Sequence, residues 1–215
     1  MYVNSDVDAP HKRAEYHRWY VDVHFPEVTA PGIFGDARMF RNAREPLPEG
    51  ELPFLALYET ARPDVEQAAV DFERHVESLF ADRRIHPGTV GGLFAIYRCL
   101  ALHASAASPH AHSLVAVHLD AAEGQEEALR AWGAARAGPE SEVFALCQTA
   151  AFLERTRGEG FVRATQPDQP RFLLVLESDR GDPVGLASRL VGKLDLADAG
   201  GLALPRGAAC FSRNP

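Results

Sequence analysis

The sequence has few cysteines, and none of them are paired in a motif. Its three cysteines, Cys99, Cys147 and Cys210, lie far apart and form no C-x-x-C pair. An odd number of separated cysteines is typical of a reducing compartment, and it supports neither a disulfide framework nor a structural zinc site. We therefore expect three thiols in the core of a cytoplasmic protein.

Long apolar runs are also missing. The longest stretches, residues 172–176 and 91–97, fall far short of the roughly 18 apolar residues that a membrane-spanning helix needs. Residues 1–6 have neither the basic nor the apolar segment of a signal peptide. The sequence therefore predicts no membrane span and no secretion.

Positive charge and nucleotide motifs are scarce. The formal net charge is −8, and no basic cluster is longer than Arg83-Arg84, so the chain would repel a phosphate backbone. A glycine-rich phosphate loop, a G-x-S-x-G motif and a dinucleotide fingerprint are all absent from the sequence. Nucleic acids and nucleotide cofactors are not expected partners, whereas 215 residues that are 46% apolar suffice for a sizeable core.

Two similar stretches occur in the two halves of the chain. Residues 54–60 and 172–178 are both apolar strands that end in Glu followed by a hydroxyl residue. Each precedes a turn, an amphipathic stretch and a final apolar strand. We expect these helices at 64–81 and 183–193, and the final strands at 90–102 and 207–212.

Further elements precede each of these stretches in the same order. We expect first strands at 2–8 and 113–120, helices at 10–28 and 123–157, the second broken at Gly138-Pro139, and glycine-led strands at 32–40 and 160–164. The order βαββαβ, present twice, is that of the ferredoxin-like unit. The sequence predicts an α+β fold of two tandem ferredoxin-like repeats, residues 1–103 and 112–215, packed sheet to sheet as an α+β barrel. Two independent domains are the alternative, although each would then expose an apolar sheet face.

The first helix carries an unusual set of polar aromatic residues. A helix turns by about 100° per residue, which places four aromatic or apolar side chains on one stripe of the helix and two histidines at the edge of that stripe. We expect the proline at position 26 to end the helix soon afterwards. The stripe is formed by Tyr16, Trp19, Tyr20 and Val23, and the histidines are His17 and His24.

This segment resembles a known family. The pattern Trp-Tyr-x-x-x-His-x-Pro-Glu at residues 19–27, the Pro31-Gly32 pair and the strand at 54–59 resemble the dimeric α+β barrel superfamily, especially its EthD-like branch. The resemblance covers nearly all of residues 1–102. In the second half the order of elements matches, but the His-x-Pro signature is absent.

The resemblance implies a pocket between the first helix and the sheet, with His24 at its edge. Imidazole is well suited to proton transfer near neutral pH, and nearby phenols could hold a carbonyl or enolate oxygen. The implied function is a cofactor-independent enzyme that cyclises, isomerises, eliminates from or monooxygenates a hydrophobic cyclic or aromatic molecule. His24 and Tyr20 are the expected catalytic residues, and Tyr16, His17, Trp19 and Tyr58 the expected substrate-binding residues.

Three alternatives stay open. His24 could serve only to cap the end of its helix. The barrel could be a binding or accessory protein without catalysis, or a haem protein of the chlorite dismutase-like type, which has a similar plan of two halves. Self-association into a homo-oligomer is also left open.

Other polar residues carry weaker signals. We expect Glu59 and Glu177 to be solvated at strand ends, and Asp36 and Arg38 to pair on one strand face. A metal site is not expected, because no carboxylate or cysteine lies at ligand spacing from the second-half histidines. These histidines are His110, His112 and His118.

Overall fold

The computed structural model describes residues 1–105, 111–156, 170–194 and 203–213. These residues form two compact units. Unit 1 contains Met1–Met39, Glu49–Tyr97 and Thr156, and unit 2 contains Phe40–Pro48, Arg98–Arg155 and the described residues from Pro170 onwards. In these described residues, no helix is both long enough and apolar enough to cross a membrane.

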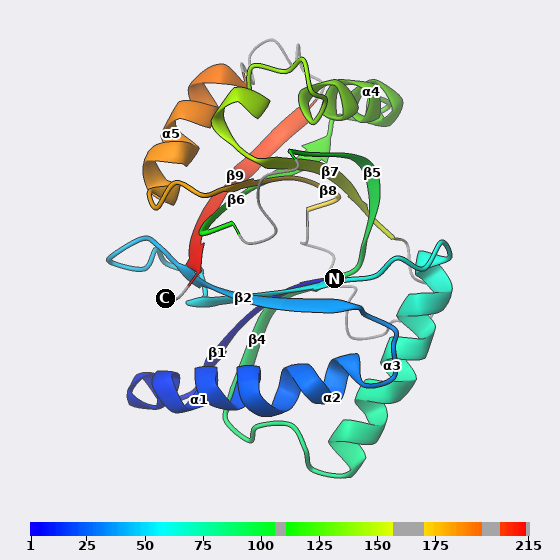
Figure 1. The fold of residues 1–215 in the computed structure, drawn as a ribbon, viewed down its shortest axis with the longest axis vertical. Helices are drawn as coiled ribbons and strands as arrows, with labels where there is room; N and C mark the ends of the chain where they lie inside the picture. Colours follow the sequence, from blue (N-terminus) through cyan, green and yellow to red (C-terminus); the bar gives the residue numbers. More distant parts are fainter. Residues whose placement is uncertain (106–110, 157–169, 195–202, 214–215) are drawn as a thin grey trace. The chain divides into compact units, whose positions relative to one another are not determined.

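Unit 1 has the predicted order of elements. A continuous helix of four segments follows the first strand, and the next two strands precede a long helix and a final strand (Figure 1). The elements are β1 (Tyr2–Val7), the short 3-10 helix η1 (Pro10–Lys12), α1 (Arg13–Trp19), the π-helical segment η2 (Tyr20–His24), α2 (Phe25–Thr29), β2 (Asp36–Asn42), β3 (Phe54–Glu59), α3 (Val65–Ala81) and β4 (Thr89–Ala95). The last residues of β2, from Phe40 onwards, belong to unit 2.

The helices of unit 1 cover one face of its sheet. β1 is central and pairs antiparallel with both β3 and β4, and the strand order is β4-β1-β3-β2. Apolar side chains of the strands, such as Val3 and Val7, pack with Tyr16 of the first helix and Phe72 of α3. The side chain of Asp64 caps α3 by accepting a hydrogen bond from the main-chain N–H of Gln67 at 2.8 Å.

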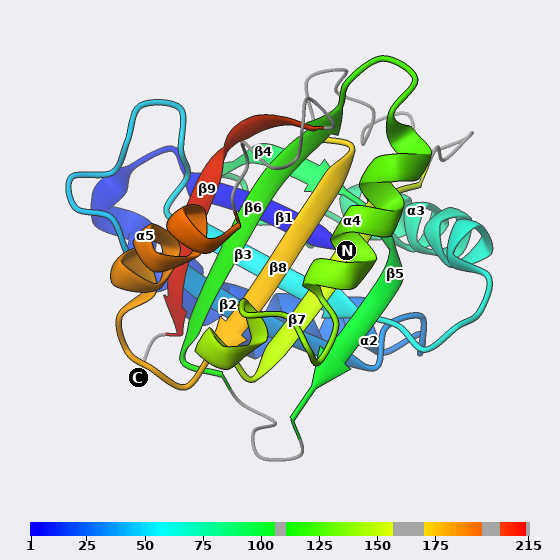
Figure 2. The same ribbon diagram turned by 90° about the horizontal axis from the view of Figure 1, so that it is seen from above.

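Unit 2 repeats the order βαββαβ after one additional strand. Its sheet has the order β9-β6-β8-β7-β5, and α4 and α5 lie over these strands (Figure 2). All seven residues of β8 are buried. The elements are β5 (Tyr97–Ala104), β6 (Ser113–Ala121), α4 (Glu126–Arg136), the 3-10 helix η3 (Phe144–Leu146), β7 (Thr149–Arg155), β8 (Phe172–Ser178), α5 (Pro183–Lys193) and β9 (Ala203–Arg213).

The α+β fold class is confirmed, but one predicted helix is wrong. The stretch expected at 123–157 is helical only up to Arg136, close to the expected break at Gly138-Pro139. After the break, Thr149–Arg155 forms strand β7, which pairs antiparallel with β8. The sequence of β7, Thr-Ala-Ala-Phe-Leu-Glu-Arg, is rich in helix-favouring residues, yet pairing and the burial of Phe152 decide its structure. The strand expected at 160–164 lies outside the described residues.

The strand expected at 90–102 is interrupted. β4 ends at Ala95 and β5 begins at Tyr97. Between them, the main-chain oxygen of Ile96 accepts a hydrogen bond from the N–H of Thr156 at 2.9 Å. β4 pairs with β1, whereas β5 neighbours β7 in the strand order, so the chain forms two strands instead of one.

The prediction of three buried thiols is correct for two cysteines. Cys147 and Cys210 are buried, whereas Cys99 on β5 is exposed and the prediction for it is wrong. β5 is the last strand in the order of the unit 2 sheet, so residues on it have fewer neighbours than those on central strands.

Candidate functional site in unit 1

The first helix contains a π-helical turn that determines which side chains are buried. In η2, the main-chain N–H of Phe25 donates to the oxygen of Tyr20, five residues earlier. Pro26 follows at once and has no N–H to continue the ordinary pattern. Turns of this kind occur frequently at functional sites.

The extra residue in this turn changes the predicted stripe. The buried positions after Tyr20 are Phe25 and Val28, whereas Val23 is 41% exposed. The prediction that Val23 belongs to the buried stripe is therefore wrong. The helix ends at Thr29, three residues after Pro26 and one residue beyond the expected end at position 28.

Four aromatic side chains of this helix lie against one another. The imidazole of His24 stacks on Trp19, with ring centroids 5.0 Å apart and an interplanar angle of 22°. The same imidazole meets the Tyr20 ring edge to face at 4.7 Å. Tyr16 contacts both Trp19 and Tyr20, at 5.8 and 5.5 Å. The structure thus brings His24 together with three of the predicted binding and catalytic residues.

Strand β3 adds a phenol to the group. The Tyr58 hydroxyl donates to the Tyr20 hydroxyl at 3.2 Å, and both side chains are buried. Burial raises the pKa of both hydroxyls above the ordinary value for tyrosine. Both phenols are therefore neutral at physiological pH. We call Tyr16, Trp19, Tyr20, His24 and Tyr58 the His24 cluster.

His24 is electrically neutral at physiological pH. Burial, and to a smaller extent the nearby His75, lower the pKa of His24 to about 4. His75 lies on α3, and its Nε2 is 2.8 Å from the main-chain oxygen of Glu27. Among the described residues, Nδ1 of His24 is enclosed and has no hydrogen-bond partner.

The remaining predicted residue, His17, lies at the margin of the cluster. It is half-buried, and its ring centroid is 6.0 Å from that of Phe54. The structure also adds His86, which the sequence did not indicate. Its ring centroid is 5.3 Å from that of Trp19 and 5.4 Å from that of Tyr16. His86 stands in the turn between α3 and β4, and the Pro-Gly pair after it signalled only a turn.

The two strand-end glutamates differ in their exposure to solvent. Glu59 is exposed as expected, and it pairs with Arg38. The expected ion pair of Arg38 with Asp36 is confirmed at 3.6 Å. Glu177 is only 8% exposed, so its predicted solvation is wrong. β8 is central in its sheet, and this position buries even its last residues. Burial, together with the Glu177 carboxylate, raises the pKa of the Cys147 thiol to about 12.

The second-half histidines do not gather in the described residues. His112 is exposed, His118 is half-buried and His110 lies outside the described part of the chain. Within that described part, no group of three or more histidine, cysteine, aspartate or glutamate side chains could hold a metal ion.

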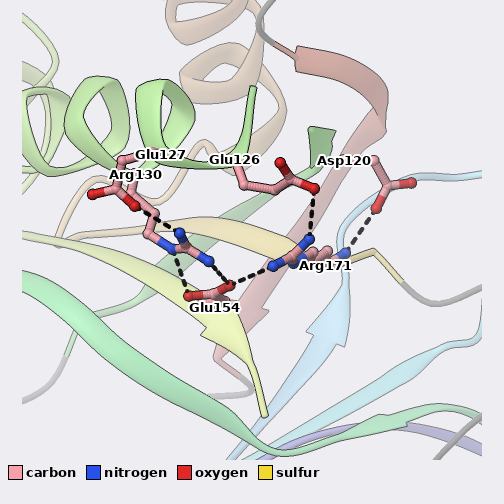
Figure 3. Close-up of polar contacts among 6 residues, drawn as sticks. All are labelled: Asp120, Glu126, Glu127, Arg130, Glu154 and Arg171. Atoms are coloured by element: carbon pink, nitrogen blue, oxygen red, sulfur yellow. Dashed lines mark hydrogen bonds and ion pairs between the residues drawn. The ribbon is translucent and has the colours of Figure 1, made fainter. Parts of the chain in front are cut away.

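Unit 2 contains a second polar cluster, formed by ion pairs (Figure 3). Arg130 of α4 donates to both oxygens of Glu154 on β7, at 2.9 and 2.7 Å. Arg171 donates to Glu154 at 3.2 Å and to Glu126 at 3.1 Å, and its main-chain N–H donates to Asp120. These mutual contacts satisfy both guanidinium groups and link β6, α4, β7 and β8. We regard the cluster as structural.

Glu154 is expected to contribute measurably to stability. The hydrogen bonds from Arg130 are the main cause that lowers the pKa of Glu154. Its contribution is therefore present above the ordinary glutamate pKa of about 4.3 and is lost as the pH falls below it. We expect Glu154→Gln to lower the free energy of unfolding at pH 7 by about 1–2 kcal/mol in urea titrations.

Glu127→Gln is the matched control for this prediction. Glu127 also accepts from Arg130, at 2.8 Å, but its side chain is 89% exposed, against 18% for Glu154. An exposed ion pair contributes at most about 1 kcal/mol and commonly less. Equal losses in the two variants would contradict a central role for Glu154.

The lowered pKa of His24 predicts a pH-dependent stability. An unfolded histidine has a pKa near 6.5, so between pH 6.5 and 4 the unfolded chain binds a proton that the folded chain excludes. The difference in bound protons between the unfolded and the folded state is small above pH 7, and its cost to stability accumulates as the pH falls toward 4. Relative to His24→Gln, the wild type should lose about 2 kcal/mol of unfolding free energy between pH 7 and 4.5. The free energies of unfolding of both proteins are measured by urea titration at each pH. If they change in parallel with pH, His24 has an ordinary pKa and the prediction is wrong.

Comparison with known proteins identifies the fold. No family model matches the sequence, and no curated protein matches it. A structure described as a chlorite dismutase shares 12% sequence identity with a TM-score of 0.55, covering 99% of this chain and 93% of the other. An anthrone oxidase-like structure shares 12% identity with a TM-score of 0.52, covering 100% and 90%.

A third structure, described as a monooxygenase from Lactobacillus acidophilus, shares 9% identity with a TM-score of 0.48, covering 99% of this chain and 92% of the other. Identities this low establish likeness of fold alone. The chlorite dismutase and anthrone oxidase-like matches show that the chain has the α+β barrel type of fold that the sequence resemblance implied.

Proposed function

We propose that the His24 cluster binds a hydrophobic cyclic or aromatic molecule and promotes proton transfer in it, without a bound organic cofactor. Enolisation of such a molecule would lead to cyclisation, isomerisation, elimination or monooxygenation. The observation that carries this proposal is a neutral, half-buried imidazole that stacks on Trp19 and meets the Tyr20 ring edge to face. A titratable group among aromatic side chains is the combination that such chemistry requires.

Each member of the cluster has a role in this proposal. His24 promotes the proton transfer, and Tyr20 stabilises charge that develops on the substrate. The rings of Tyr16 and Trp19 provide flat apolar contact, and Tyr58 orients Tyr20 through their 3.2 Å hydrogen bond. His17 contacts the substrate from the margin.

We also propose that the chain is EthD-like and arose as a tandem repeat with domains at 1–103 and 112–215. The repeated order βαββαβ supports this proposal. Assembly into a homo-oligomer, a small molecule as the natural partner, and a cytoplasmic location belong to the same proposal.

The likeness to an anthrone oxidase-like structure suggests a first probe. Anthrone is a flat aromatic ketone with an acidic ring methylene. Removal of a methylene proton gives an enolate, which reacts with dioxygen to a hydroperoxide. Loss of water from the hydroperoxide leaves anthraquinone, so one anthrone and one dioxygen give one anthraquinone and one water.

The experiment measures dioxygen consumption and anthraquinone absorbance with purified protein and anthrone. We expect the protein to accelerate both at equal rates over buffer. Saturable binding of anthrone without acceleration would favour the binding or accessory alternative. Neither binding nor acceleration would contradict the proposed substrate class.

The haem alternative can be compared with the described histidines of unit 2. An axial ligand needs a neutral imidazole nitrogen that is open to the iron. His112 is exposed at the edge of β6, the Nε2 atom of His118 is enclosed, and His103 meets the Phe144 ring edge to face at 4.3 Å. In the described part of unit 2, these side chains do not fit an axial haem ligand. We expect an absorption spectrum after expression with haem supplied to lack a Soret band, and a Soret band that is lost on replacing a single histidine would favour the haem alternative.

A further inference from the structure

The two ring nitrogens of His24 have different surroundings. Nδ1 is enclosed by protein atoms and has no hydrogen-bond partner among the described residues. Nε2 is not among these enclosed atoms, and the side chain as a whole is half-buried. Stacking on Trp19 and edge contact with Tyr20 hold the plane of the ring.

This asymmetry determines which nitrogen carries the proton. A neutral imidazole has one N–H and one lone pair. An N–H at Nδ1 would be a buried donor without an acceptor, and such donors are rare and costly in folded proteins. A lone pair at Nδ1 leaves only an acceptor unsatisfied, and the N–H at Nε2 can then reach water or a ligand.

We infer that His24 is held as the Nε2–H tautomer and donates a hydrogen bond to an oxygen of the bound molecule, which is therefore an aromatic ketone or its enolate. The inference rests on the proposed function for its ligand, but the tautomer itself does not. A neutral imidazole can act in this way on a carbonyl group, stabilising the negative charge that develops on oxygen during enolisation.

The Nε2–H tautomer determines how His24 promotes proton transfer. With its proton at Nε2 and its lone pair enclosed, the imidazole cannot remove the methylene proton of a substrate that approaches Nε2. It acts instead on the oxygen, and the carbon-bound proton passes to solvent or to another group. His24 thus determines which end of the ligand faces the helix.

The tautomer can be measured without any ligand. Long-range proton–nitrogen correlation spectra of uniformly labelled protein at pH 7 distinguish the two tautomers and the imidazolium form. The His24 signals are assigned by their loss in His24→Gln. We expect the Nε2–H pattern for His24. An Nδ1–H pattern or an imidazolium pattern would overturn the inference, even if anthrone is turned over.

The ligand oxygen can be tested with two matched probes. Fluorenone and fluorene have nearly the same flat shape, but only fluorenone has a carbonyl oxygen. We expect the ratio of the fluorene Kd to the fluorenone Kd to be about 3- to 10-fold larger in wild type than in His24→Phe. The amide of His24→Gln reaches about as far as Nε2 and should keep most of the preference.

The outcomes separate this inference from the proposed function. An equal ratio in wild type and His24→Phe, or no binding of fluorenone up to its solubility, would overturn the assignment of a ketone ligand. A protein that shows the Nε2–H pattern and the fluorenone preference but does not oxidise anthrone would keep this inference, and only the proposed catalysis would fail.

Discussion

Replacement of His24 by alanine is expected to lower the rate of anthrone oxidation by a factor on the order of 10² to 10⁴. The imidazole promotes proton transfer by donating a hydrogen bond to the oxygen on which charge develops, and alanine has no group that can donate one. Contacts with Trp19 and Tyr20 would be lost too, but Tyr16 and Phe25 keep the helix anchored in the core. We therefore expect an unchanged circular dichroism spectrum and a large loss of kcat.

His11→Ala is the matched control for this substitution. His11 is an exposed histidine of the same unit, near the start of the first helix and outside the His24 cluster. Its replacement should leave kcat within a factor of about two, as expected for a surface change that removes no substrate contact. Equal rates for wild type and His24→Ala would show that His24 takes no part in the reaction.

Gly133→Ala is expected to lower the free energy of unfolding by about 2–3 kcal/mol. Gly133 is buried in α4, and a Cβ atom at this position would overlap the ring of Phe152. That ring is fully buried and stacks on Phe172, with centroids 5.6 Å apart and planes 3° from parallel, so it has little freedom to move. Alanine normally stabilises a helix by about 1 kcal/mol over glycine, so a net loss shows that the overlap dominates.

Two further variants test the cause of this loss. Gly181→Ala adds the same methyl group where no atom lies within 4 Å, and its free energy of unfolding should stay within about 0.5 kcal/mol of wild type. Adding Phe152→Leu to Gly133→Ala should restore part of the stability, because leucine vacates the space that the methyl group needs. A Gly133→Ala protein as stable as wild type in urea titrations would contradict the packing of α4 on β7.

The order of elements could be predicted because the signals were local. Phe54–Glu59 and Phe172–Ser178 are apolar runs bounded by turn residues, and α3 and α5 follow each of them with a clear apolar face. β7 could not be predicted in this way. Its residues favour a helix individually, and only its antiparallel neighbour β8 makes the strand the better structure.

The candidate site was predictable in membership but not in geometry. Tyr16, Trp19, Tyr20 and His24 lie within nine residues of one helix, so a helical wheel brings them near one another. The wheel assumes a regular helix, and the π-helical turn before Pro26 moves Val23 out of the buried face. His86 joins the group from a turn about 70 positions along the chain from Tyr16, a distance that no local pattern spans.

Indole N–H signals test most directly whether the His24 cluster is the binding site. The chain has two tryptophans, Trp19 in the cluster and Trp132 on α4 of unit 2, where Arg136 lies over its ring. Titration of labelled protein with fluorenone should shift the Trp19 indole signal saturably and leave that of Trp132 in place, with assignment by Trp132→Phe. A shift confined to Trp132, or no shift of the Trp19 signal at saturating probe, would contradict a ligand site at His24.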